Sequence, residues 1–157
     1  MGANCCILCP QERMVLMRLC GFAVSSGDLV GVVLEKKEDN WMVVDTSPSK
    51  LTIDDIFKTE NVRSFSQLVT AYLRDNLVDH VVIRRLATGG KFAGGASAFC
   101  IGAIVQLSTD KPVNFISSRS IALEFKKHSC KIPASLYKYQ HDAYKTATAY
   151  IAKELGR

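Results

Sequence analysis

Residues 79–95, DHVVIRRLATGGKFAGG, join a short apolar run to two arginines and a glycine-rich segment that carries one lysine. Val81, Val82 and Ile83 are a continuous β-branched run, which predicts a central strand covered on both faces. A helical pattern precedes this run, so we expect a crossover helix and a parallel neighbouring strand. The stretch indicates an α/β protein, in which a ligand typically binds where such a strand ends.

The segment before this strand predicts an antiparallel meander. Residues 15–24, 29–35 and 41–45 have strand patterns, and the first two are joined by the turn formers Ser-Ser-Gly-Asp at 25–28. Residues 46–61 mix Ser, Pro, Thr and acidic side chains, so we expect a loop with at most one helical turn there.

Helices dominate the rest of the chain. Ser64 and Gln67 have the spacing of a capping box, and the apolar residues that follow have a helical period. The small residues Ala143 and Ala147 would let a last helix lie close to the sheet. The expected order is β-β-β-α-β-α-β-α-α, with five strands in a mixed sheet and helices on both faces. The elements expected after the glycine-rich segment are a helix, a strand and two helices, at residues 96–107, 113–116, 117–125 and 143–155.

Composition places few demands on the fold. The 157 residues are 48% hydrophobic and 22% charged, which suits one globular domain. We expect residues 1–13 to be a disordered extension, or to precede the true start, and residues 14–157 to form the domain. Neither a secretory signal nor an apolar run of membrane-spanning length is apparent. We therefore expect a cytoplasmic protein without a membrane partner.

The six cysteines favour a reducing compartment over a disulfide framework. Cys5, Cys6 and Cys9 crowd the N-terminus with a spacing that resembles a metal site. However, no histidine occurs before His80 and no second CxxC completes four ligands, so a structural zinc site is not expected.

The positive charges of the glycine-rich stretch have two interpretations. Arg84, Arg85 and Lys91, beside glycine N–H groups and a helix start, would bind phosphate. Alternatively, successive strand residues point to opposite faces, so the two arginines would not line one pocket, and the glycines simply allow a tight turn. The glycines of the candidate anion site are Gly89, Gly90, Gly94 and Gly95.

The C-terminal part is basic. From residue 119 onward there are eight basic and three acidic residues, so this part accounts for the whole net charge of +5. Tyrosines alternate with lysines there, a composition that contacts phosphates and stacks on bases. A basic helical surface with half-buried tyrosines is the alternative. The residues concerned are Lys131, Tyr137, Lys138, Tyr139, Tyr144 and Lys145.

Two resemblances carry the family assignment. The element order resembles the ribonuclease H-like fold, and the RuvC-type Holliday junction resolvases in particular. The loop at 90–95, GKFAGG, with Val82-Ile83-Arg84 before it and residues 146–150 near the end, resembles a bacterial family named domain of unknown function 3010. This likeness covers about residues 17–151. The positions that match the resolvase site are Leu19-Cys20-Gly21-Phe22-Ala23, Val81-Val82-Ile83-Arg84 and His141-Asp142-Ala143.

The resemblance implies a carboxylate at each of these three positions, and the chain departs from it twice. Ala23 stands where the first Asp is expected and Arg84 where the central Glu is expected. Asp142, with His141 beside it, remains as the candidate catalytic pair. Two-metal cleavage needs several carboxylates on cations about 4 Å apart, and a guanidinium would repel such ions.

The acidic residues have two other interpretations. Asp28 and Asp45 lie near strand ends and could replace the lost carboxylates, although a turn residue and a solvated strand end explain them better. Asp142 could simply interact with the dipole at the start of its helix.

Three functions remain open. We expect a degenerate domain that binds DNA or RNA, or another anionic partner, without a cofactor. A divergent nuclease would need Mg²⁺ or Mn²⁺ and would depend on Asp142. An interaction module would bind a protein partner and no nucleic acid. The RuvC resemblance makes a homodimer an expected assembly under all three.

Overall fold

The computed structural model describes residues 17–87 and 95–156. The expected N-terminal extension, the cysteines at its centre, and Gly89, Gly90, Lys91 and Gly94 lie outside these ranges. In the described part, no helix is long and apolar enough to cross a membrane.

The first three strands form the expected meander. Strands β1 (Arg18–Ser25), β2 (Asp28–Lys37) and β3 (Asn40–Val44) pair antiparallel in chain order. The expectation of five strands is wrong, because a sixth, β4 (Lys50–Thr52), pairs with the start of β2 in the segment expected to be a loop. Its pattern spans only three residues, of which Leu51 alone is buried, so periodicity gave no signal.

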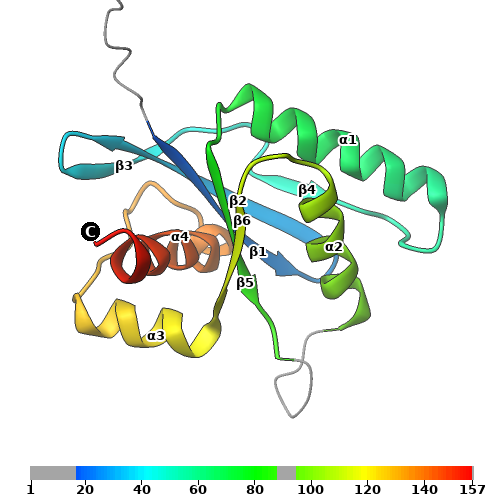
Figure 1. Cartoon of the computed structure of the whole chain (residues 1–157). Helices are drawn as coiled ribbons and strands as arrows, with labels where there is room; N and C mark the ends of the chain where they lie inside the picture. Colours follow the sequence, from blue (N-terminus) through cyan, green and yellow to red (C-terminus); the bar gives the residue numbers. More distant parts are fainter. Residues whose placement is uncertain (1–16, 88–94, 157) are drawn as a thin grey trace, which may run out of the picture.

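The sheet is completed by parallel strands, as the central apolar run predicts. Strands β5 (His80–Arg85) and β6 (Val113–Ser117) follow β1, and the sheet order is β3-β2-β1-β5-β6 (Figure 1). Helix α1 (Thr59–Asp75) precedes β5, and α2 (Ala96–Leu107) crosses from β5 to β6.

The start of α1 differs from the expected one. The helix begins five residues before Ser64, and its N-cap, Lys58, makes no side-chain capping bond. Ser64 and Gln67 are exposed residues within the helix, so the capping box is wrong. Val62 packs against the core from this first turn, and that contact extends the helix beyond its best capping signal.

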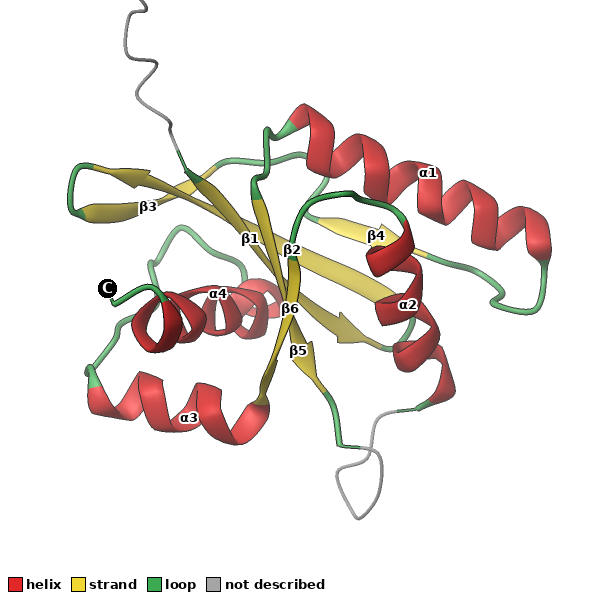
Figure 2. Ribbon diagram, in the orientation of Figure 1, coloured by secondary structure: helices red, strands yellow, loops and turns green. Residues whose placement is uncertain are grey.

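Helices cover both faces of the sheet (Figure 2). The core on the α1 and α2 side contains Val81 and Ile83, and the core on the other side contains Val82. Helices α3 (Ser118–Lys127) and α4 (His141–Glu154) cover this second face, and a short 3-10 helix, η2 (Lys138–Gln140), precedes α4. The continuous apolar run of β5 is therefore buried on both faces, as predicted.

Helix α4 lies very close to the sheet, which confirms the reading of its small residues. Ala143 and Ala147 are fully buried. A Cβ atom added to Gly21 of β1 would stand 2.8 Å from Ala147 Cβ and 2.9 Å from its backbone nitrogen. A glycine at this point of β1 lets the helix backbone approach the strand.

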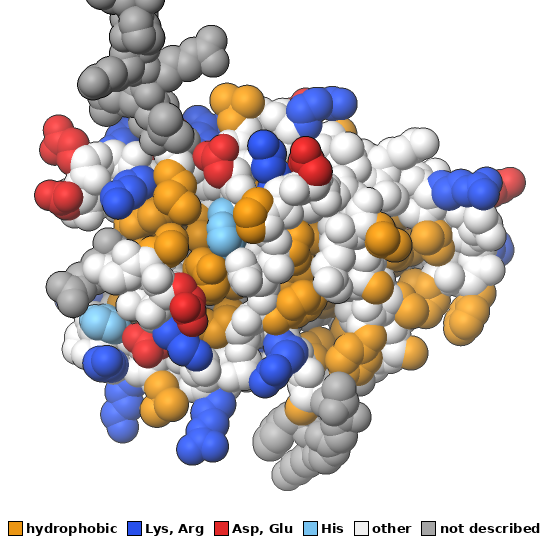
Figure 3. Space-filling view, viewed as in Figure 1, with side chains coloured by type: hydrophobic (Ala, Val, Ile, Leu, Met, Phe, Trp, Pro, Cys, Tyr) orange, Lys and Arg blue, Asp and Glu red, His pale blue; other side chains and the backbone are white. Residues whose placement is uncertain are grey.

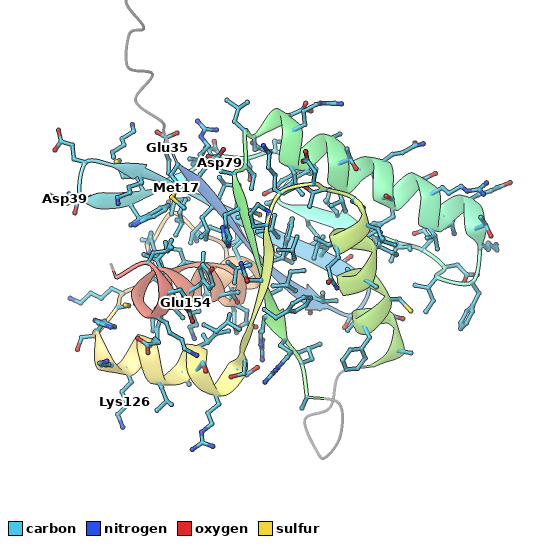
Figure 4. All side chains as sticks on the ribbon, viewed as in Figure 1. Met17, Glu35, Asp39, Asp79, Lys126 and Glu154 are labelled. Atoms are coloured by element: carbon cyan, nitrogen blue, oxygen red, sulfur yellow. The ribbon has the colours of Figure 1, made fainter. Side chains whose placement is uncertain are left out.

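A partly buried ion pair lies at the edge where β1 and β5 begin. Arg18 Nε donates to Glu35 Oε2 at 2.7 Å, and Arg18 Nη1 donates to the carbonyl of Asn76 at 2.9 Å. The backbone nitrogen of Arg18 donates to Asp79 Oδ2 at 2.9 Å. Figure 4 labels Glu35 and Asp79 near the start of β1.

Candidate nucleic-acid interface

The opposite edge of the sheet, where β5 and β6 end, brings several predicted residues together. Arg84 pairs with Ile116 and Arg85 with Ser117, so both strands end side by side. Helix α3 starts directly after β6, where Ser117 Oγ caps it by accepting a hydrogen bond from Ser120 N at 3.1 Å. Open α/β sheets bind ligands at such carboxyl ends.

Arg84 and Asp142 form an ion pair at this edge. Arg84 Nη1 lies 3.0 Å from Asp142 Oδ2, and Arg84 Nε donates to Ser118 Oγ at 3.0 Å. The pair is open to water, because the side chains are 30% and 60% exposed, respectively. The Arg84 guanidinium is therefore bonded to a carboxylate oxygen of Asp142, the residue that the RuvC resemblance implies as a metal ligand.

Ala23 completes the row of matched positions without contributing a polar atom. Phe22 pairs with Ile83, so the next residues, Ala23 and Arg84, lie at the same level of neighbouring strands. Ala23 is 4% exposed and packs in the core beneath α4. The three matched positions thus converge in space as methyl, guanidinium and carboxylate.

A hollow of about 390 Å³ opens beside the ion pair, and we call it the Arg84 hollow. Three cations and one anion line it, which leaves a net charge of +2. Lys145 Nζ lies 5.6 Å from the centre of the Phe125 ring, and Lys126 projects from α3 (Figure 4). Lys and Arg side chains gather around α3 and the lower end of the sheet in Figure 3. The lining residues are Arg84, Ser118, Ile121, Ala122, Phe125, Lys126, Asp142 and Lys145.

Arg85 lies toward the other face of the sheet, which α2 covers. It borders a smaller hollow, of about 160 Å³, with Phe99 and Phe115. Arg84 also borders this smaller hollow, but Arg85 does not line the Arg84 hollow, which agrees with the alternative that the two side chains point to opposite faces.

The other predicted residues lie apart from the Arg84 hollow. His141 is half-buried at the first position of α4, and Lys138 is exposed in η2; neither lines the hollow. Gly95 is the N-cap residue of α2. Tyr144 is half-buried, and burial raises the pKa of its hydroxyl, so it belongs to the packed alternative rather than to an exposed aromatic surface.

The alternative acidic residues have structural partners or a different location. Asp28 Oδ1 accepts a hydrogen bond from Thr52 Oγ1 at 2.6 Å, which ties β4 to the start of β2. Asp45 borders a separate hollow near Tyr137. Neither residue lines the Arg84 hollow.

The donor set does not fit the paired Mg²⁺ ions of a two-metal nuclease. Such a site needs several hard oxygen ligands, whereas Asp142 is the sole carboxylate that lines the Arg84 hollow and is already bonded to a guanidinium. Within residues 17–87 and 95–156, no three His, Cys, Asp or Glu side chains gather as a metal-binding group.

Sequence reasoning missed two groups near this edge. The sequence indicates Ser118 only as a helix start, yet its hydroxyl accepts a hydrogen bond from Arg84. Lys50 was placed in a loop, and the structure puts its ammonium 4.4 Å from the centre of the Tyr139 ring. Neither contact has a signal in the local sequence, because both join residues more than thirty positions apart.

The fold is RuvC-like, one of the ribonuclease H-like folds. Thermus thermophilus RuvC matches with a TM-score of 0.62 at 15% identity, over 89% of this chain and 97% of that one. T. thermophilus RuvC in complex with a Holliday junction substrate matches with a TM-score of 0.67 at 13% identity, over 89% of this chain and 96% of that one. The yeast mitochondrial Holliday junction resolvase Ydc2 matches with a TM-score of 0.52 at 11% identity, over 85% of this chain and 75% of that one. At these identities the likeness establishes the fold.

The family follows from the sequence itself. Residues 17–150 match the family described as protein of unknown function DUF3010, and the chain belongs to that family. A comparison with curated proteins finds no match. Both the family resemblance and the fold class predicted from the sequence are confirmed.

Proposed function

We propose that this protein is a non-catalytic RuvC-like domain that binds the phosphate backbone of nucleic acid at the Arg84 hollow. The Arg84–Asp142 ion pair carries the proposal. At a site where a nuclease of this fold would gather carboxylates, the chain has one carboxylate, and a fixed positive charge lies within 3.0 Å of it. A divalent cation brought there would meet repulsion from the guanidinium.

The same arrangement suits a phosphate. A guanidinium has five N–H donors, and the contacts of Arg84 with Ser118 and Asp142 use two of them. Lys126 and Lys145 add positive charge on the other sides of the hollow. Phosphate neutralisation by such residues gives binding that weakens steeply with salt.

The structural likeness supports nucleic acid as the partner class. One of the similar structures is RuvC in complex with a Holliday junction substrate. We therefore propose DNA or RNA, rather than a small anion, as the ligand, and we place binding at the edge where β5 ends. A homodimer remains an expected assembly.

Substitution of Asp142 separates binding from cleavage. In our proposal, Asp142→Asn removes a negative charge next to Arg84 and raises affinity for nucleic acid by roughly threefold. In a divergent nuclease, the same substitution abolishes products formed with Mg²⁺ or Mn²⁺. The measurement is binding and cleavage of single-stranded, duplex and four-way-junction DNA, and of matching RNA, with Mg²⁺, Mn²⁺ or chelator at two salt concentrations.

Two further variants complete this experiment. Arg84→Ala is expected to weaken binding and to lower the salt slope by about 1, as the loss of one phosphate contact does. Lys58→Ala, an exposed lysine at the start of α1, is the matched control and should change neither quantity. Metal-dependent products that disappear in Asp142→Asn would replace our proposal with a nuclease. Absence of any binding would point to a protein partner.

A further inference from the structure

Two tyrosines stack on each other at the surface just before α4. The Tyr137 and Tyr139 rings lie 5.6 Å apart between centroids, with an interplanar angle of 6°. Their side chains are nevertheless exposed, at 67% and 42%. A parallel aromatic pair that remains open to water can accept a further flat ring on its exposed face. We call this pair the tyrosine platform.

The platform is held in place by its surroundings. Gln140 is buried, and its Oε1 accepts a hydrogen bond from the backbone nitrogen of Tyr137 at 3.0 Å. The hydroxyl of Tyr139 shares a 2.8 Å hydrogen bond with Ser49 Oγ, and Lys50 Nζ lies 4.4 Å from the ring centre of Tyr139. These contacts hold the backbone of Tyr137 and the ring of Tyr139 in place before a ligand arrives, which reduces the entropy lost on binding.

The platform and the Arg84 hollow lie on the same face of the sheet. Lys50 pairs with Val30, and Val30 pairs with Ala23, whose neighbour across the next strand is Arg84. Paired residues share a face, and both Val30 and Ala23 pack under α4. Three strand spacings of about 4.8 Å separate Lys50 from Arg84, or about 15 Å in all.

This separation matches a short length of nucleic acid. Each nucleotide of one strand in a duplex advances about 3.4 Å along the helix axis, so roughly four nucleotides cover 15 Å, and fewer do when the strand is extended. A strand with its phosphates at the Arg84 hollow would thus have a base near the tyrosine platform. The exposed ammonium groups of Lys50 and Lys138 are beside that path.

We propose that the tyrosine platform stacks on an unpaired base of a strand whose phosphates bind the Arg84 hollow. This inference rests on the function proposed above and narrows its ligand to nucleic acid with unpaired nucleotides. Base stacking on an aromatic side chain is largely independent of sequence, because every base has a π-face. Bases inside a duplex are already stacked on one another, so a blunt duplex offers the platform only the outer faces of its two terminal pairs.

The test compares Tyr137→Ala with the wild type on two probes. One is a single strand of about 12 nucleotides that carries a fluorescent base analogue, and the other is its blunt duplex. We expect Tyr137→Ala to weaken single-strand binding roughly tenfold and duplex binding less than about twofold. The quenching of the analogue that stacking causes should disappear in this variant.

Two control variants make the result specific. Tyr137→Phe keeps an aromatic face and should retain both affinity and quenching. Phe57→Ala removes an aromatic ring that is 89% exposed elsewhere on the molecule, and it should change nothing. If Tyr137→Ala leaves both affinities unchanged, or weakens binding to both probes equally, the stacking proposal is wrong, while Arg84→Ala still tests the proposed function. If wild type binds neither probe, both proposals fail together.

Discussion

An arginine–carboxylate pair stands at each of two opposite edges of the sheet, and the two pairs differ in their access to water. Arg18 and Glu35 meet at 2.7 Å with 22% and 8% of their side chains exposed, whereas Arg84 and Asp142 meet at 3.0 Å with 30% and 60% exposed. The first pair also ties down the carbonyl of Asn76. The second pair opens onto a hollow of about 390 Å³. The comparison indicates that the first pair stabilises the fold and that the second remains available to a ligand.

The largest expected effect comes from Gly21, which lies in β1 between the two edges. Gly21→Ala would place a Cβ 2.8 Å from Ala147 Cβ and push α4, which carries Asp142, away from β1. We expect a loss of about 3 kcal/mol in the free energy of unfolding, measured by urea denaturation, because the close-packed helix backbone cannot relax freely. The Arg18 pair should survive in the folded fraction. A loss below about 1 kcal/mol would show that α4 adjusts easily.

The two ion pairs should then differ in stability. Glu35→Gln leaves Arg18 without its carboxylate at a mostly buried position, and we expect a loss of about 2 kcal/mol. Asp142→Asn acts on an exposed pair, and we expect a loss below about 1 kcal/mol. Both variants are compared with wild type in the same urea titration. Equal losses would contradict the structural difference between the two edges.

For nucleic-acid affinity the order of the two edges should be the opposite: substitutions at the Arg84 hollow should have the larger effect. Lys145→Ala removes a charge from the Arg84 hollow and should weaken binding roughly threefold. Lys37→Ala, in which the lysine stands 3.8 Å from Glu35 at the other edge, should leave affinity unchanged. Fluorescence anisotropy on one labelled strand at fixed salt measures both. A similar loss in the two variants would indicate diffuse electrostatic attraction rather than a site.

The smallest expected effect is a pH dependence of the free energy of unfolding, which comes from His80 at the edge where β1 and β5 begin. Burial lowers the pKa of His80, whose Nε2 accepts a hydrogen bond from the Asn114 amide at 2.7 Å, which requires a neutral ring. The unfolded chain therefore binds a proton more tightly than the native one. The free energy of unfolding should fall as the pH drops through about 6.5, and should level off below the native pKa of His80.

The measurement for His80 is urea denaturation between pH 8 and pH 5 on the wild type and on His80→Gln, with about 1 kcal/mol or less expected between them. The variant should lose less stability than the wild type over this interval. A parallel decline in both would assign the pH dependence to other groups.

The crossover order and the faces of β5 could be predicted from the sequence, because burial on both sides requires an uninterrupted apolar run. Val81, Val82 and Ile83 supply that run. The close approach of α4 was equally readable from Ala143 and Ala147. Strand β4 was missed, since its three residues are fixed by pairing with β2 and by the burial of Leu51 rather than by their own pattern.

The candidate site could be predicted only in part. The sequence by itself determined which chemical groups are present, namely that Ala23 and Arg84 replace two expected carboxylates and that Asp142 remains. Tertiary structure alone decided that Arg84 meets Asp142, that Lys50 meets Tyr139, and that the hollow and the tyrosine platform share one face of the sheet. Local patterns report the burial and periodicity of neighbouring residues. These contacts instead depend on strand register and helix docking, because Arg84 and Asp142 are 58 positions apart in the sequence and Lys50 and Tyr139 are 89 positions apart.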